Sequence, residues 1–129
     1  MKVFLFIFIL LFPKVIYAEW INLYDTLEGH KFYYNSETVK RSGNFIFYHQ
    51  MIDLIKPMKI NDEHFLSMKS YLKINCTNFD VQPHSVKAFD EPLGEGNMVL
   101  KEFHSNAEWE KQGPNSTDVA INKYLCKNY

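Results

Sequence analysis

The stretch Phe-Ile-Phe-Tyr-His-Gln-Met-Ile, residues 45–52, is the clearest strand in the sequence, and the fold can be worked out from it. Successive side chains of a strand point to opposite faces of a sheet. One face carries Phe45, Phe47, His49 and Met51, and the other carries Ile46, Tyr48, Gln50 and Ile52. Because both faces are largely apolar, the pattern predicts a central strand that is covered on both sides. The turn-forming run Arg-Ser-Gly-Asn at 41–44 precedes it, and Pro57 is expected to end it.

Segments on either side are predicted to extend the sheet. Residues 30–34 and 98–103 read as short strands, separated from their neighbours by polar or glycine-rich loops. Residues 65–76 read as a longer strand, although a helix is the competing interpretation because the hydrophobic period is irregular. In the extended segment 79–89, Pro83 indicates either an edge strand or a bulge.

A short helix is predicted near the C-terminus. Asn115 or Ser116 is a suitable N-cap, and Asp118 would lie in the first turn, where a negative charge is favourable. Apolar residues at helical spacing then indicate a helix over residues 119–126. These signals predict a β-dominated chain with one terminal helix.

The first eighteen residues have the pattern of a cleavable signal peptide. Lys2 gives a positive start, residues 3–12 form an unbroken apolar run, and Ala18 offers a small residue for cleavage before Glu19. A membrane-spanning helix needs roughly 20 apolar residues, so this run is too short for one. We therefore expect an exported protein, located in the periplasm or on the outer cell surface.

The expected mature chain, residues 19–129, has the size of one domain. Loss of Lys2 and Lys14 with the leader moves the formal net charge from −1 to −3. This balance does not favour a nucleic acid or an anionic membrane surface as the partner.

Cys76 and Cys126 are the two cysteines of the chain. In an oxidising compartment such a pair predicts one disulfide, and closing a loop of this length would be worth about 4 kcal/mol in the chain-entropy model. It would join the C-terminal helix to the end of a strand. A zinc site would need two more suitably spaced ligands, and the sequence has no CxxC motif.

The order of short motifs along the chain resembles the surface-adhesin protein E family of exported bacterial proteins. The matching pieces are Glu19-Trp20, the run 32–35 (Phe-Tyr-Tyr-Asn), the run 39–44, Asp53 with Pro57, the run 66–69 before Cys76, the run 94–96, Trp109, the run 114–116 and Cys126. The sequence departs from the family pattern at Asn35, His49 and Asn75, where an aspartate, a tryptophan and an acidic residue are usual.

The resemblance implies an α+β fold, with a small antiparallel sheet and a C-terminal helix tied to it by a disulfide. It also implies adhesion to host extracellular proteins, including matrix proteins, and dimerisation through the sheet. A fold does not fix a function, so a periplasmic structural or assembly accessory without a host ligand stays an alternative.

Aromatic side chains are the candidate contacts for a protein partner. Phe, Trp and Tyr make up 16% of the chain, and three consecutive aromatics cannot all point inward from one strand. Exposed aromatic rings bury much area at low entropic cost. We name Phe32, Tyr33, Tyr34 and Trp109 as candidates; cross-strand packing is the competing role. An unpaired sheet edge could also add a partner chain.

A small hydrolase or metal-binding protein is the least favoured alternative. His49 and Asp53 lie four residues apart, which allows a base with an orienting carboxylate, but the sequence has no nucleophile motif. The five histidines are scattered without metal-ligand spacing. We expect no catalytic residues, no metal, no small-molecule cofactor and no nucleic-acid partner.

Overall fold

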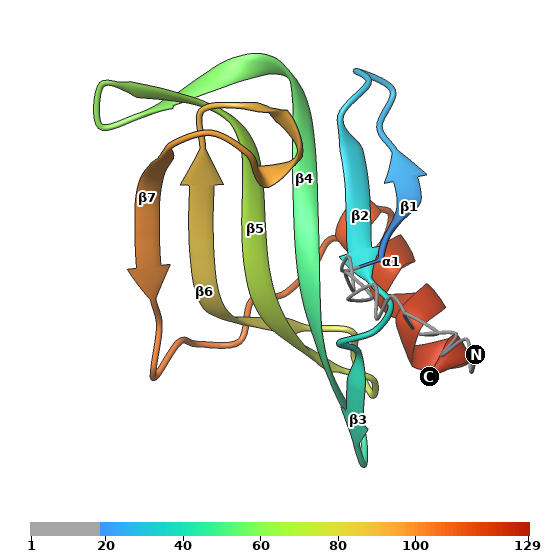
Figure 1. The fold of residues 1–129 in the computed structure, drawn as a ribbon. Helices are drawn as coiled ribbons and strands as arrows, with labels where there is room; N and C mark the ends of the chain where they lie inside the picture. The colour runs from blue at the N-terminus through green and yellow to red at the C-terminus, as the bar shows by residue number, and fades with distance from the viewer. Residues whose placement is uncertain (1–18) are drawn as a thin grey trace, which may run out of the picture.

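The computed structural model describes residues 19–129, which form one antiparallel sheet and a C-terminal helix (Figure 1). The predicted signal peptide, residues 1–18 with its cut after Ala18, lies outside the described residues. The strands are β1 (Trp20–Asp25), β2 (Lys31–Asn35), β3 (Lys40–Ser42), β4 (Phe45–Ile60), β5 (Glu63–Asn75), β6 (Val81–Phe89) and β7 (Met98–Phe103). A short 3₁₀ turn, η1 (Pro92–Gly94), precedes β7, and the helix is α1 (Thr117–Asn128). The predicted α+β class and antiparallel sheet are confirmed.

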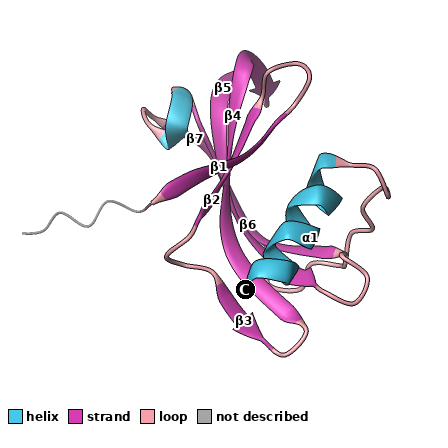
Figure 2. Ribbon diagram, turned by 90° about the vertical axis from the view of Figure 1, so that its right-hand side faces the viewer, coloured by secondary structure: helices cyan, strands magenta, loops and turns pink. Residues whose placement is uncertain are grey.

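The strand order is β1-β2-β4-β5-β6-β7, with β3 paired to β4 (Figure 1). The central position predicted for residues 45–52 is therefore confirmed. The two faces of β4 are covered unequally. Ile46 and Tyr48 are 0% and 1% exposed in the core beside α1, whereas Phe45 and Phe47 on the other face are half-buried. One helix can cover only one face of the sheet, as the side view shows (Figure 2).

Pro57 does not end β4, and that expectation was wrong. The pairing of β4 with β5 shifts its register between Asp53 and Met58, so Pro57 lies where no ladder hydrogen bond requires its missing N–H. The strand then continues to Ile60 and turns through Asn61 and Asp62. Both turn residues have positive φ, 48° and 66°, as a two-residue type I′ hairpin requires.

Residues 63–75 form strand β5, so the strand interpretation is confirmed over the helix alternative. The neighbouring strand β6 pairs with β5 on one side and β7 on the other, so it is an internal strand. Of the two explanations for Pro83, the bulge is correct. The register shifts where Tyr71 faces Ser85 and Leu72 faces Pro83, which leaves His84 as the extra residue.

Helix α1 is fixed at both ends. Ser116 is the N-cap, and its Oγ accepts a hydrogen bond from the Val119 N–H at 3.2 Å. Ile121 and Leu125 are 2% and 0% exposed and pack in the same core as β4 and β5. Near the other end, the predicted disulfide joins Cys126 to Cys76, which follows β5. The described part of the chain has no helix that is long and apolar enough to cross a bilayer.

Candidate functional site: a lysine–aromatic face of the sheet

The face of the sheet opposite the core carries aromatic rings and lysines in alternation with buried residues. On β4 these are Phe45, Phe47 and His49, and the paired residues on β5 include Tyr71 and Lys73. We define the lysine–aromatic face as Trp20, Phe45, Phe47, His49, Lys69, Tyr71, Lys73, His84, Lys87 and Trp109.

Lys73 lies at the centre of the most closely packed part of this face. Its Nζ is 4.4 Å from the ring centroid of Phe45, 5.3 Å from that of Phe47 and 5.5 Å from that of Trp109. The Phe45 and Trp109 rings are stacked, with centroids 5.9 Å apart. Cation–π contact of this kind holds a long, flexible side chain in place. The Lys73 ammonium group is therefore favoured beside these three rings.

His49 belongs to a second aromatic group next to the first. Its ring centroid lies 4.6 Å from that of Tyr71, and Tyr71 also packs at 5.8 Å from His84. The His49 Nδ1 is 3.0 Å from the Thr38 hydroxyl. Burial lowers the pKa of His49, and the charge of Lys87 lowers it further. The ring is therefore neutral at pH 7 and serves as a packing surface.

Lys69 and Lys87 face one another directly across β5 and β6. Like charges in this position repel each other. Together with Trp20 and His49 they line a hollow of about 120 Å³. Among the ion pairs formed within residues 19–129, none involves Lys69, Lys73 or Lys87. Their positive charges are thus available to an anionic partner.

The four predicted contact aromatics do not form one surface. Trp109 is 38% exposed and belongs to the lysine–aromatic face. Tyr33, half-buried, pairs with Met51 on that same side of the sheet. Phe32 is half-buried against the core. Tyr34 is 3% exposed, and its hydroxyl is hydrogen-bonded to that of Tyr129, so Tyr34 must be removed from the set of contact residues.

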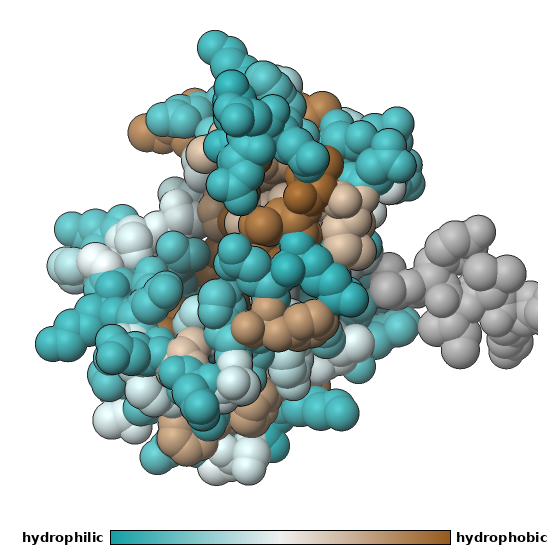
Figure 3. Space-filling model, turned by 90° about the vertical axis from the view of Figure 1, so that its left-hand side faces the viewer, coloured by the Kyte–Doolittle hydropathy of each residue, from teal (hydrophilic) through white to brown (hydrophobic). Residues whose placement is uncertain are grey.

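The outermost strand β7 carries two exposed apolar side chains. Phe103 pairs with Ser85, which in turn pairs with Tyr71, so Phe103 lies on the same side of the sheet as the lysine–aromatic face. Phe103 is 70% exposed and Met98 is 46% exposed, at opposite ends of the strand. Figure 3 views the molecule from the β7 side and shows apolar side chains gathered among hydrophilic ones. β1 and β7 lie at the two ends of the strand order, so the outer edge of β7 is one of the two places where an added strand could pair.

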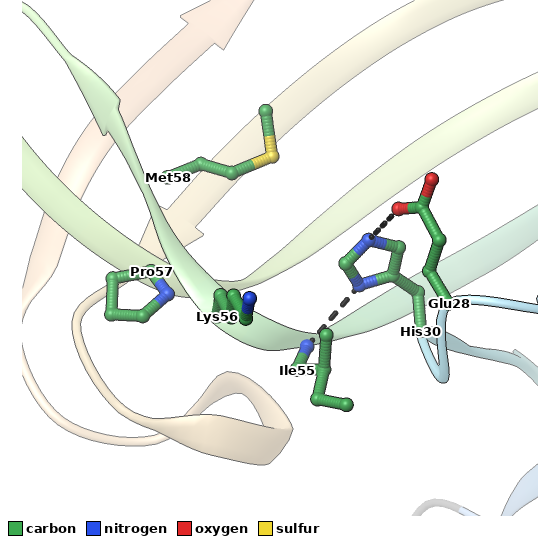
Figure 4. Close-up of a pocket in the computed structure, with 6 residues that line it drawn as sticks. All are labelled: Glu28, His30, Ile55, Lys56, Pro57 and Met58. Carbon is green, nitrogen blue, oxygen red and sulfur yellow. Dashed lines mark hydrogen bonds and ion pairs between the residues drawn. The ribbon is translucent and has the colours of Figure 1, made fainter.

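A larger hollow, of about 600 Å³, lies between the β1–β2 turn and the irregular segment of β4 (Figure 4). His30 spans it: Nδ1 accepts a hydrogen bond from the Ile55 N–H at 3.2 Å, and Nε2 is 3.1 Å from the Glu28 carboxylate. Both ring nitrogens are therefore engaged with the protein itself, and His30 holds the turn against β4.

His49 and Asp53 do not act as a pair. His49 is bonded to Thr38, whereas the Asp53 carboxylate accepts a hydrogen bond from the Leu93 N–H at 3.0 Å and holds η1 in place. Within residues 19–129, no group of three His, Cys, Asp or Glu side chains is arranged to hold a metal ion.

Sequence reasoning missed the lysines of this face. The signal was present as Lys-x-Tyr-x-Lys at 69–73, opposite the apolar side of the same predicted strand. The sequence alone does not give the register between β4 and β5. The lysines lie beside the β4 aromatics only because Phe47 pairs with Lys73 and Met51 pairs with Lys69. The role of Trp109 as the cover of Phe45 likewise depends on the path of an irregular loop.

Comparisons with known proteins agree with this architecture. A model of the surface-adhesin protein E family matches residues 20–127. Crystal form II of Haemophilus influenzae protein E is similar in structure, with a TM-score of 0.63 at 19% identity, covering 91% of this chain and 94% of that one. Its selenomethionine form gives a TM-score of 0.62 at 17% identity, covering 91% and 92%. No curated protein matches the chain in sequence.

Proposed function

This chain belongs to the surface-adhesin protein E family, and on that premise we propose that it is an exported adhesin module that binds a host extracellular protein. The lysine–aromatic face would make the contact. The observation that carries this proposal is that Lys69, Lys73 and Lys87 share one sheet face and that none of them has a carboxylate within ion-pair distance among the described residues.

An acidic region of a partner protein fits this face. Its carboxylates would be attracted to Lys73 and to the hollow between Lys69 and Lys87, while its apolar groups would pack on Trp109 and Phe45. Aromatic rings supply most of the energy at such contacts, and exposed charges mainly raise the rate of association. Binding is therefore expected to weaken, without vanishing, as salt is raised.

Direct binding tests this proposal. The mature chain, residues 19–129, is applied to immobilised extracellular matrix proteins, and the partner it retains is used to compare two triple variants. Lys69, Lys73 and Lys87 are changed to Gln in one, and the exposed Lys56, Lys111 and Lys127 in the other, so that the net charge is equal. A loss of at least tenfold in affinity in the first variant alone is expected. Equal loss in both, or binding to no matrix protein, contradicts the proposal.

Export and surface exposure are part of the same proposal, with residues 1–18 acting as a signal peptide that is removed. Protease added to intact cells should digest the protein while a periplasmic marker survives. Protection of both would favour the periplasmic accessory role without a host ligand. Mass determination of the mature chain, with Glu19 expected at its N-terminus, tests the cleavage itself.

A homodimer formed through a sheet edge is a second candidate, favoured by the exposed Phe103 on β7. Sedimentation over a range of concentrations measures it, and Phe103→Glu should shift the equilibrium toward the monomer. We propose no enzymatic role: Ala substitution of both His49 and Asp53 is expected to leave hydrolase assays and metal titrations unchanged.

A further inference from the structure

A groove lies on the other face of the sheet, beside the first turn of α1. Its volume is about 280 Å³. The floor is largely apolar and is formed by β4, β5 and β6, including Leu72 and Val86. The wall carries two carboxylates, Glu110 and Asp118, and His104, whose Nε2 is 3.5 Å from the Glu102 carboxylate. Among the described residues, no Lys or Arg side chain lines the groove. We call this the acidic groove.

Gln50 is the polar residue of the groove floor, and its amide is not satisfied. The residue is 5% exposed, and its Nε2 is buried without a hydrogen-bond partner within residues 19–129. A buried amide that is left unpaired destabilises the protein, because it has lost its hydrogen bonds to water. An acceptor oxygen placed in the groove would accept a hydrogen bond from Gln50 Nε2. The groove floor therefore favours a ligand that carries such an oxygen.

The carboxylates of the wall are held by backbone structure. Glu110 forms an isolated bridge with Val81: the Val81 N–H donates to its carbonyl at 3.1 Å, and its own N–H donates to the Val81 carbonyl at 2.7 Å. Asp118 is fixed in the first turn of α1. Burial raises the pKa of the Asp118 carboxyl, and the charge of Glu110 raises it further, so the two charges act on one another.

We propose that the acidic groove binds a lysine or arginine side chain of a partner polypeptide. The aliphatic stem would lie on the apolar floor, the cationic head between Glu110 and Asp118, and the carbonyl of the same residue beside Gln50. A volume slightly below the range of drug-sized ligands suits one long side chain. This second site is independent of the lysine–aromatic face and complementary to it in charge.

Titration followed by NMR tests the proposal, with N-acetyl-lysine methylamide and N-acetyl-arginine methylamide as probes. Saturable shifts of the Gln50 side-chain amide and of the Asp118 backbone amide are expected. N-acetyl-norleucine methylamide has a similar apolar stem and no charge, and it should bind at least tenfold more weakly. Equal binding of the uncharged probe, or no shift at Gln50, would overturn the proposal.

Matched variants distinguish binding by the groove carboxylates from a general effect of the net charge on the lysine probe. Glu110→Gln with Asp118→Asn removes the two wall charges, and Glu95→Gln with Glu108→Gln removes two exposed charges that do not line the groove. Only the first pair should weaken the lysine probe tenfold or more. Gln50→Leu, which keeps a side chain of similar size, should weaken it several-fold. The Lys69, Lys73 and Lys87 triple variant should bind the probe normally, whatever the fate of the proposed adhesin function.

Discussion

At the scale of single residues, His49 links the stability of the sheet to pH. Its pKa lies below the ordinary value of 6.5 because the ring is buried and Lys87 is near. The unfolded chain therefore binds a proton more readily than the folded protein does. The contribution of the neutral His49 ring to the free energy of unfolding is complete above pH 6.5. It is lost as the pH falls through the pKa that His49 has in the folded protein.

We expect the free energy of unfolding to decline from pH 7 to pH 5, with part of that decline assigned to His49. Chemical denaturation of the wild type and of His49→Phe at several pH values measures it. The variant should show a shallower decline, because the other histidines are common to both proteins. Parallel curves for the two would rule out this role of His49.

Ile46 and Ile55 provide a matched pair on one strand. Ile46 is 0% exposed, whereas Ile55 is 57% exposed. Ile46→Ala leaves a cavity in the core and is expected to cost about 2–5 kcal/mol of unfolding free energy. Ile55→Ala should stay within about 0.5 kcal/mol of the wild type. Denaturant midpoints compare the two, and a similar cost for both would mean that the burial of Ile46 contributes no more to stability than the exposed Ile55 does.

At the scale of elements, the N-terminus of α1 depends on one hydroxyl. Ser116→Ala removes the acceptor for the Val119 N–H and should cost about 1 kcal/mol. Ser116→Asp keeps an acceptor at the same position and should cost much less. Thermal unfolding of the two variants distinguishes the loss of the cap from a general effect of substitution at this site.

The elements that were predictable are those whose own sequence carries a strong period or a defined boundary. β4 follows from its alternation of apolar residues, and α1 follows from a cap and helical spacing. β1 and β3 were not identified, although Trp20–Asp25 is as long as β7, because these segments acquire strand structure by pairing with β2 and β4. Local β-propensity is a weak predictor of a strand whose formation depends on pairing with its neighbours.

The same limit explains the candidate site. Trp109 could be named in advance as an aromatic in an irregular segment, yet its neighbours Lys73 and Phe45 come from strands far away in sequence. Tyr34 was predicted as a contact residue, whereas it is buried in the core. Its strand alternation was clear, but which side would face α1 depended on the path of the whole chain. The sequence identified which residues are aromatic, but it did not predict where the fold would place them.

At the scale of the whole molecule, one sheet separates two surfaces of opposite character. The lysine–aromatic face presents uncompensated positive charge, and the acidic groove presents negative charge on the other side. A single host protein with an acidic and a basic region could contact both only by reaching around an edge of the sheet. Two separate partners, or two segments of a flexible one, fit this arrangement better.

The disulfide ties the ends of this architecture together. Cys76 and Cys126 are 50 residues apart, and opening the loop is expected to cost about 4 kcal/mol. Denaturant unfolding with and without a thiol reductant measures this loss. A variant with both cysteines changed to Ser should match the reduced protein and be unaffected by the reductant. A wild-type midpoint that does not move on reduction would contradict the expected contribution.

The same bond decides how the protein would respond to being pulled. Tension applied between Glu19 and Tyr129 would pass along β1 to β5, cross the sulfur–sulfur bond, and leave through the last residues of α1. Strands β6 and β7 lie inside the closed loop and would carry no load. Full extension would be shorter by about 170 Å than for the reduced chain, at roughly 3.4 Å per residue. Tension would therefore extend the segments outside the loop, while Lys87 and Trp109 stay on a segment that is not stretched as long as the bridge is intact.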